Sequence, residues 1–418
     1  MPQHVLFVAL TGHGHVTPTL PLVGELVRRG HRVDYATAAE HSSAVAAAGA
    51  RWVALPSMAP FTPPAQVGPE VMAAWFRHFF AAMRAAYPVL LDHCATQRPD
   101  AICYDATNWP ARLVAHRLGI PAVRCVPHLA SNETFSLDAR LTAGLDPAHP
   151  GMAAFAADCA HFSAEHGVHL DPAGTVDVPA ALNLVFVPRE FQPAADSFDD
   201  RFRFIGPLLD SRRQRESWSP RDPDAPTLFV SLGSVMTDAA FYRTCLAAFG
   251  DGPWQVAMTV ADQDTAALGT VPSNVDIRPR FPQLAVLRHA AAFISHAGMN
   301  SIMEALCHGV PLITFPQTPE QVANADRVRE LGLGERLDAT ALTPEAVRDA
   351  VTRVSSSPAI RTNLDRMRRS IQDSGGVARG ADEIERHLGI TPTAAGGGGS
   401  TGPGPASGPT SPRWPSPR

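Results

Sequence analysis

Short apolar runs alternate with helical patterns along most of the chain. The runs predicted as strands are residues 5–10, 32–37, 101–105, 122–126 and 183–187, followed by 227–232, 255–260, 275–279, 292–296 and 311–315. Strands that alternate with helices favour parallel pairing, because each return to the same end of a sheet needs a crossover connection. The pattern therefore predicts an α/β fold made of doubly wound parallel sheets.

The alternation is interrupted once, by a polar, proline-bearing stretch near residues 207–226. Because 418 residues are enough for two cores, we expect an N-terminal domain, a linker, a C-terminal domain, a final amphipathic helix and a tail. Their predicted bounds are 1–207, 208–226, 227–372, 373–390 and 391–418. The tail is rich in glycine, proline and serine and is expected to be disordered, since it can bury little apolar surface.

Composition narrows the choice of partners. No apolar run approaches the roughly 20 residues that cross a bilayer, and the N-terminus enters a strand without a secretory signal. A cytoplasmic protein with no membrane span is therefore expected. A net charge of −5 argues against nucleic acid as the main partner, which leaves small molecules.

Cysteine and lysine usage excludes some chemistry. The six cysteines lie singly, with no C-x-x-C pair, so reduced thiols are expected rather than disulfides or a zinc site. The chain contains no lysine, which excludes a Schiff-base lysine and a lysine-based phosphate loop.

The first loop, GHGHVTP, places His13 and His15 between an apolar strand and a helix. Thr17 and Pro18 predict the helix start, with threonine as the N-cap and proline at the first helical position. His15 is then expected just before the helix, at the carboxyl end of a parallel strand, where open α/β sheets bind ligands. The helix dipole disfavours imidazolium there, so the sequence predicts a neutral His15 that can accept a proton. An exposed turn and a fortuitous metal pair are the alternatives.

Asp105 ends another strand of the same predicted sheet. A carboxylate at that point could orient the His15 imidazole and stabilise its protonated form. The alternative is an aspartate that only caps the next helix.

A second loop, HAGMNS, follows a strand of the C-terminal half. His296, Gly298, Asn300 and Ser301 predict a diphosphate site, because small residues allow close backbone approach and the first helical turn has free N–H groups. Glu304 follows one turn after Asn300 and is expected beside the hydroxyls of a ribose.

Two further turns at strand ends add polar groups. Residues 231–234, which end with Ser234, can donate to phosphate. Glu320 and Gln321 begin another predicted helix, and a carboxylate with an amide suits a polyhydroxylated sugar. The alternative is that TPEQ serves only as a helix-capping sequence.

In their order along the chain, these motifs resemble the nucleotide-sugar signature of the family 1 glycosyltransferases. The matching positions are Pro282, Gln283, HAGMNS, Glu304, HGVP at 308–311, Glu320 and Gln321. With the G-H-x-x-P loop at the front, the resemblance covers residues 4 to 390. The phrases GHGHVTP, WPARLVA, VSLGS and PQLAVLRHA are similar to the bacterial macrolide glycosyltransferases within that family.

The resemblance implies the GT-B architecture, in which two Rossmann-like domains face a cleft and the last helix returns to the first domain. The first domain would bind the acceptor and the second the nucleotide sugar, with His15 as the catalytic base and Asp105 as its partner. The implied donor contacts are Ser234, Arg280, Phe281, Gln283, His296, Gly298, Met299, Asn300, Ser301, Glu304, Glu320 and Gln321. The implied reaction is an inverting transfer of a hexose from UDP-glucose to a lipophilic natural product such as a macrolide, with no metal or other cofactor required.

Three positions depart from the family pattern. Thr17 stands where the first loop of the family often has an asparagine, and it is interpreted as a tolerated helix cap. Arg280 and Met299 stand where the family often has tryptophans, one of which stacks on uracil. Arginine can also stack through its planar guanidinium, so base binding is expected with a weaker preference for uridine over thymidine.

An aromatic-rich helix near residues 72–87 is the predicted acceptor wall, with Trp75 and Phe79 as contacts. Ser131 and Asn132, in the loop at 128–135, are the other expected acceptor contacts. The alternative is that the aromatic stripe is plain core.

Other functions remain open from the residues alone. They are a TDP-deoxysugar transferase of antibiotic biosynthesis, a nucleotide-sugar epimerase, a non-catalytic nucleotide-sugar-binding partner and a membrane-associated lipid-acceptor transferase. The GHGHVTP loop argues against the epimerase, and the presence of both His15 and Asp105 argues against the non-catalytic partner. The expected assembly is a monomer or a homodimer.

Overall fold

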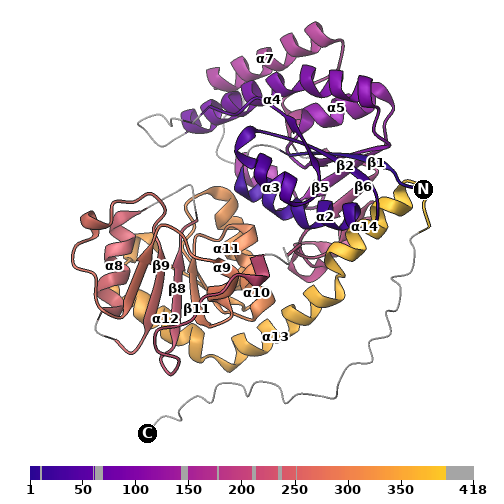
Figure 1. Ribbon diagram of the computed structural model, residues 1–418. Coiled ribbons are helices and arrows are strands. Elements are labelled where there is room, and N and C mark those ends of the chain that lie inside the picture. The colour runs from indigo at the N-terminus through magenta and orange to yellow at the C-terminus, as the bar shows by residue number, and fades with distance from the viewer. Residues whose placement is uncertain are drawn as a thin grey trace, which may run out of the picture.

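The computed structural model describes residues 1–9, 12–59, 61, 69–142, 149–176, 178–209, 213–233, 238–250 and 252–391. Its strands form two parallel sheets, one in each of two lobes (Figure 1). The first sheet has the order β3-β2-β1-β4-β5-β6-β7 and the second the order β10-β9-β8-β11-β12-β13. The chain winds outward in both directions from β1 and from β8, which confirms the predicted doubly wound α/β fold.

The strand bounds follow most of the apolar runs. The first sheet contains β1 (His4–Val8), β2 (Arg32–Thr37), β3 (Arg51–Ala54), β4 (Ala101–Asp105), β5 (Ala122–Val126), β6 (Leu182–Val185) and β7 (Phe202–Phe204). The second contains β8 (Thr227–Ser231), β9 (Gln255–Thr259), β10 (Val275–Arg278), β11 (Ala290–Ser295), β12 (Leu312–Thr314) and β13 (Gly334–Arg336). The sequence pattern did not predict β3, β7 and β13, and all three lie at sheet edges. Edge strands are often short and bury little, so their apolar signal is weak.

The helices connect the strands. In the first lobe they are α1 (His13–Val16), α2 (Leu20–Arg28), α3 (Ser42–Ala47), α4 (Pro69–Gln97), α5 (Trp109–Leu118), α6 (Leu137–Thr142) and α7 (Pro150–His166). The rest are α8 (Ala239–Phe249), α9 (Gln283–Leu287), α10 (Met299–His308), α11 (Pro319–Glu330), α12 (Pro344–Ser356), α13 (Pro358–Asp373) and α14 (Gly376–His387). Short 3-10 helices include η1 (Thr17–Thr19) and η4 (Arg189–Phe191).

Both faces of the first sheet are buried, as expected for a parallel sheet. Residues of α2 and α14 pack on one face, and residues of α4, α5 and α7 pack on the other. A further apolar cluster crosses between the lobes, because it joins Leu137 and Phe191 of the first to Ile302, Ala323 and Val328 of the second. The two lobes therefore share part of their core. The exact predicted domain boundaries stay predictions, and the predicted tail from 392 onward lies outside the described residues.

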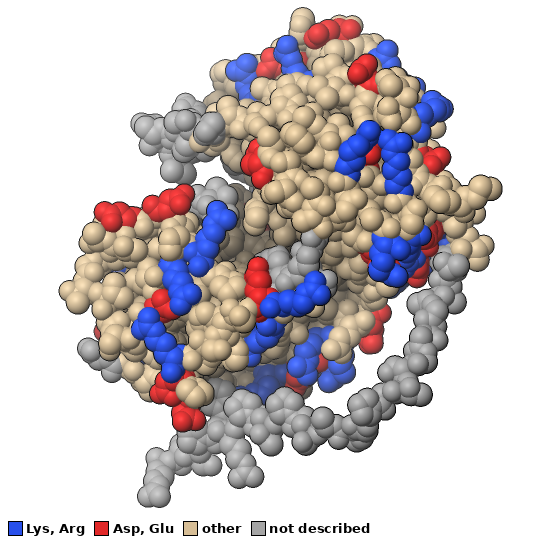
Figure 2. Space-filling view, in the orientation of Figure 1, with Lys and Arg blue, Asp and Glu red and all other residues tan. Residues whose placement is uncertain are grey.

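Among the described residues, no helix combines the length and the apolar character needed to span a membrane. On the face shown in Figure 2, arginines and acidic residues are interspersed over both lobes.

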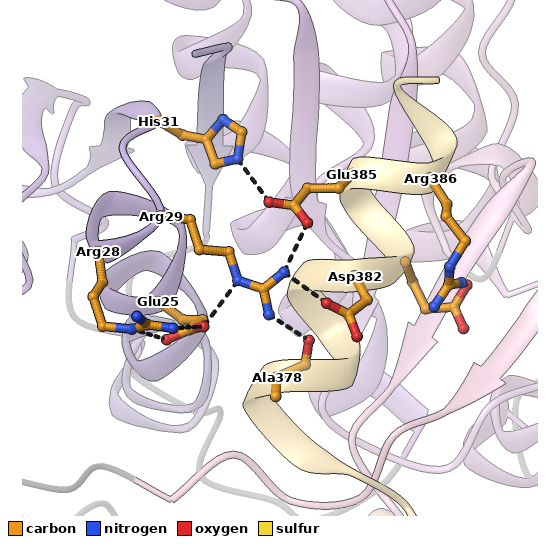
Figure 3. A network of polar contacts seen from close by, with 9 residues as sticks. Glu25, Arg28, Arg29, His31, Ala378, Asp382, Glu385 and Arg386 are labelled. Carbon is orange, nitrogen blue, oxygen red and sulfur yellow. Dashed lines mark hydrogen bonds and ion pairs between the residues drawn. The ribbon is translucent and has the colours of Figure 1, made fainter. Parts of the chain in front are cut away.

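The last helix, α14, lies beside α2 of the first lobe (Figure 1). Arg29, just after α2, donates from Nη1 to Asp382 Oδ1 at 2.6 Å and to Glu385 Oε2 at 2.7 Å, and from Nη2 to the Ala378 carbonyl at 3.1 Å (Figure 3). The His31 Nε2 atom lies 3.0 Å from the other Glu385 oxygen. One guanidinium therefore holds three positions of α14 on the first lobe.

Replacing Arg29 with methionine is expected to lower the free energy of unfolding by about 3 kcal/mol, because it leaves the Glu385 carboxylate buried without its main partner. The measurement is the denaturant midpoint, with amide exchange of α14 as the local readout. Arg28→Met is the matched control, since Arg28 is 69% exposed and pairs with Glu25. Equal midpoints for the two variants would contradict the assigned role.

Candidate active site

A cleft of about 600 Å³ opens between the lobes, at the carboxyl ends of strands from both sheets. The first lobe contributes residues 12–15, 17 and 18, together with Trp75, Phe79 and His128. The second lobe contributes Arg280, Phe281, Gln283, His296, Gly298, Met299, Asn300, Ser301, Glu304, Glu320 and Gln321. The surface is indented between the two lobes (Figure 2). Every predicted donor residue except Ser234 lines this cleft, and Ser234 lies outside the described residues.

His15 and Asp105 are in direct contact at one wall of the cleft. The His15 Nδ1 atom lies 2.8 Å from Asp105 Oδ2. The other Asp105 oxygen accepts from the Thr107 N–H at 3.0 Å and from the Thr107 hydroxyl at 2.6 Å. Asp105 is only 1% exposed, so its carboxylate has a fixed orientation. The alternative of a helix-capping Asp105 is wrong, because Asn108 caps α5 and accepts from the Ala111 N–H.

The predicted helix start at Thr17 is wrong. The helical backbone begins at His13, where the N–H groups of His15 and Val16 both donate to the Gly12 carbonyl at 3.0 Å. Thr17 itself has helical dihedral angles and opens η1 rather than capping a helix. His15 therefore sits inside a one-turn helix instead of just before a longer one.

The charge state of His15 also differs from the prediction. Burial lowers the pKa of the imidazole, but the adjacent Asp105 carboxylate outweighs burial, and with a smaller contribution from Glu320 it raises the pKa to about 9. Burial raises the pKa of Asp105, but His15 and Thr107 hold it at about 2. A full charge at hydrogen-bond distance exceeds the partial charge of a one-turn helix, so the resting pair is imidazolium and carboxylate.

The opposite wall is built around the start of α10. Gly298 is the N-cap and provides no side chain, so no side chain caps the N–H groups of the first turn, and residues 298–301 line the cleft. The preceding Ala297 has a left-handed φ of 67°, a conformation that costs energy for a residue with a Cβ. The Ser295 hydroxyl accepts from the Ala297 N–H at 3.2 Å. The side-chain amide of the buried Asn324 donates to the Ala297 carbonyl at 3.1 Å. The supporting role of Asn324 could not be predicted, because nothing in the local sequence pattern indicates that it holds a distant turn.

His296 packs tightly against this turn. Burial lowers the pKa of its imidazole to about 4, so the ring is neutral near pH 7. A Cβ at Gly298 would lie 2.4 Å from His296 Nε2, and one at Gly233 would lie 3.0 Å from the same atom. Only glycine at these two positions leaves room for the ring.

Gly298→Ala is expected to weaken UDP binding by about 10-fold or more, because the new methyl group displaces the His296 ring from the helix start. Titration calorimetry with UDP measures the effect. Gly24→Ala in α2 is the matched control, since the nearest heavy atom to its added Cβ is 3.8 Å away. Unchanged UDP affinity in Gly298→Ala would show that the ring does not contribute to the diphosphate site.

Gln283 links two of the predicted donor contacts. Its Nε2 donates to Glu304 Oε2 at 2.7 Å and to the Ser301 hydroxyl at 3.3 Å. Nearby, the Arg278 guanidinium lies 4.7 Å from the centre of the Phe281 ring, and Arg280 is exposed at the rim. The Glu304 carboxylate is therefore fixed in direction while remaining on the cleft wall.

The first residues of α11 cap the helix and also line the cleft. Thr318 is the N-cap and accepts from the Gln321 N–H, and Gln321 Oε1 accepts from the Gln317 N–H at 2.8 Å. The capping interpretation of TPEQ is therefore correct, and Glu320 and Gln321 still line the cleft.

A second cavity of about 230 Å³ extends from His15 into the first lobe. Its walls include the aromatic side chains of Trp75, Phe76, Phe79, Phe80, Trp109 and Phe155. Arg124, His128 and Asp138 add charged or polar groups. The predicted acceptor contacts Trp75 and Phe79 thus line both cavities.

Ser131 and Asn132 have a different place. The Ser131 hydroxyl accepts from the Leu137 N–H, and Asn132 Oδ1 accepts from the N–H groups of Thr134 and Phe135. Neither residue lines the two cavities described above. Their contacts stabilise the loop conformation, and the acceptor role of both residues stays a prediction.

Among the described residues, no group of three or more His, Cys, Asp or Glu side chains is arranged to hold a metal ion. His13 is exposed, and its ring centre lies 6.4 Å from that of His41.

Two doubly wound sheets that meet at a cleft, with a helix start suited to diphosphate on one wall and a His–Asp pair on the other, have the architecture of a GT-B glycosyltransferase. Residues 243–374 match the family described as Erythromycin biosynthesis protein CIII-like, C-terminal domain. The chain is 35% identical over 400 residues to NDP-glycosyltransferase YjiC of Bacillus subtilis, which covers 92% of this chain and 97% of the relative. It is 34% identical over 398 residues to demethyllactenocin mycarosyltransferase of Streptomyces fradiae, covering 91% of this chain and 86% of the relative.

Among solved structures, the calicheamicin glycosyltransferase CalG4 matches with a TM-score of 0.82 at 37% identity, covering 93% of this chain and 98% of that chain. The chain belongs to the family 1 GT-B glycosyltransferases, together with the bacterial macrolide glycosyltransferases.

Proposed function

We propose that this glycosyltransferase moves a hexose from a UDP-sugar, with UDP-glucose as the expected donor, to a hydroxyl group of a lipophilic natural product. The observation that carries the proposal is the contact between His15 and the buried Asp105, opposite the start of α10 across one cleft. A protein that only binds a nucleotide sugar needs no general base, and therefore no His–Asp pair at the cleft.

In the proposed reaction, His15 acts as the general base. Nδ1 is held by Asp105, which leaves Nε2 for the acceptor hydroxyl. Because Asp105 raises the pKa of His15 to about 9, the neutral imidazole is the minor form at pH 7, and this form accepts the proton. The acceptor oxygen then forms a bond to the anomeric carbon as the bond to the diphosphate oxygen breaks. The electron pair leaves with UDP, and attack from the opposite face inverts the anomeric centre.

The second-lobe wall of the cleft has polar groups suited to each part of a nucleotide sugar. The first-turn N–H groups of α10, with Asn300 and Ser301, would hold the diphosphate and stabilise the charge that grows on the leaving group. Glu304, oriented by Gln283, would bind the ribose hydroxyls. Glu320 and Gln321 would bind the sugar. The proposal requires no metal ion.

The aromatic cavity beside His15 supports a lipophilic acceptor. Trp75 and Phe79 line both cavities, so an acceptor could occupy the cavity in the first lobe and present its hydroxyl at His15. The names of the relatives support a natural product, since they refer to erythromycin biosynthesis, demethyllactenocin and calicheamicin.

A TDP-deoxysugar donor is the second candidate. It is favoured by the relative named as a mycarosyltransferase and by Arg280, which stands at the cleft where a stacking tryptophan is frequent in the family.

The test is incubation of the protein with UDP-glucose, TDP-glucose, a TDP-deoxysugar or no donor, together with a panel of macrolides and phenols. Mass spectrometry detects the added sugar, and NMR gives the anomeric configuration of the product. A β-glucoside that forms only with UDP-glucose supports the proposal, and a product only with the deoxysugar supports the second candidate. Tight UDP binding with no transfer to any acceptor would favour a non-catalytic binding protein.

A further inference from the structure

Arg327, on α11 of the second lobe, reaches a turn of the first lobe. Its Nε donates to the Phe191 carbonyl at 2.9 Å, and its Nη2 donates to the carbonyls of Glu190 at 2.9 Å and Gln192 at 3.3 Å. These carbonyls belong to the end of η4, where a short helix has no internal donors left for them. The rigid fork of a guanidinium holds several N–H donors in one plane and suits a set of converging carbonyls.

The same turn is attached to the acceptor side of the cleft. Gln192 is 1% exposed, and its side-chain amide pairs with the backbone of Ala130 twice. Its Oε1 accepts from the Ala130 N–H at 2.9 Å, and its Nε2 donates to the Ala130 carbonyl at 2.9 Å. Ala130 lies two residues after His128, which lines both cavities. A shift of η4 would therefore move the part of the cavity wall that contains His128.

The helix that carries Arg327 also begins at the donor site. Glu320, in its first turn, lines both cavities, and Arg327 follows two turns later on the same side of the helix. In addition, α11 packs against α6, whose residues Leu137 and Asp138 line the aromatic cavity. One helix thus contacts the expected sugar position at its start and the acceptor wall along its length.

We propose that Arg327 is a positioning residue that, through η4 and Gln192, sets the distance between the acceptor loop at 128–130 and the donor sugar. The inference rests on the proposed function, because it concerns the alignment of the acceptor hydroxyl with the anomeric carbon. Arg327 lines neither of the two cavities. Its loss leaves the donor contacts in place and allows the acceptor wall to move.

The test compares Arg327→Met with Arg329→Met, a control on the same helix. Arg329 is 65% exposed and pairs with Asp326. In Arg327→Met we expect the KM for the acceptor to rise by about 10-fold or more, while the KM for the donor changes by less than about two-fold. We also expect more UDP to be released by hydrolysis for each sugar transferred, since water can replace a misaligned acceptor. Arg329→Met should match the wild type in all three measurements.

A purely structural role would lower the active fraction and leave both KM values and the ratio of hydrolysis to transfer unchanged. That outcome, or the same changes in Arg329→Met, would overturn the inference. Arg327→Lys keeps the charge and serves if the methionine variant does not fold, and a partial rise of the acceptor KM is expected there.

Amide exchange provides a readout that does not depend on turnover. Arg327→Met should speed exchange at residues 128–132 and leave exchange within α10 unchanged, and no change at 128–132 would overturn the inference. If the wild type transfers no sugar to any acceptor, the proposed function fails, and this exchange result still decides whether Arg327 holds the loop.

Discussion

Replacing His15 with glutamine is expected to lower the rate of sugar transfer by about 10²–10⁴-fold, the usual contribution of a positioned general base. Glutamine can still donate to Asp105 but cannot take a proton from the acceptor hydroxyl. The measurement is kcat at saturating donor and acceptor, with UDP affinity measured separately by calorimetry. UDP affinity should stay within about two-fold of the wild type, because the proposed diphosphate contacts are groups of α10 and do not include the His15 side chain.

The control is His116→Gln, an exposed histidine near the end of α5. It should have the activity of the wild type. If His15→Gln kept more than about a tenth of the wild-type kcat, His15 would not be the base, since less than 1.4 kcal/mol of the barrier would depend on it.

The second large effect concerns pH and Asp105. A base works when it is deprotonated, and Asp105 holds the pKa of His15 at about 9. In the wild type, kcat/KM should therefore rise with pH and level off near pH 9. In Asp105→Asn the stabilising charge is gone while burial remains, so the pKa of His15 falls and the curve should level off at a lower pH. The plateau should be about 10²-fold lower or more, because the imidazolium that forms in the transition state loses its partner.

The two pH profiles should therefore converge toward low pH. At pH 6 the ratio of wild-type to variant kcat/KM should be smaller than at pH 10, because a larger fraction of the variant's His15 is neutral at pH 6. A constant ratio between the two pH values would show that Asp105 does not control the titration of His15. Thr107→Ala tests the orientation of the carboxylate separately, since Thr107 donates to the other Asp105 oxygen.

The interior strands and the cleft residues could be predicted because their signals are local or follow from topology. Buried parallel strands are apolar on both faces, and residues at their carboxyl ends meet at one edge of the sheet. This reasoning brought His15 and Asp105 together from two distant segments, and the structure confirms their contact. The edge strands β3, β7 and β13 were missed because two of them have three residues and the third is largely exposed.

The errors have a different origin. The charge state of His15 depends on a residue 90 positions away, and a rule for helix ends cannot weigh that contact. The left-handed backbone at Ala297 has no signature in the sequence, because alanine gives no sign of positive φ. Asn324 supports that turn from another helix. In each case the deciding interaction is non-local or internal to the backbone.

The apolar cluster shared by the lobes bears on attempts to recombine this enzyme with its relatives. Leu137 and Phe191 pack in the same cluster as Ile302 and Val328, so a cut in the linker would expose apolar surface on both halves and favour aggregation of each half alone. A chimera that takes its C-terminal half from another family member would have to match the apolar cluster between the lobes as well as the nucleotide site. Donor and acceptor preferences are therefore less interchangeable in this chain than two separate Rossmann-like units would suggest.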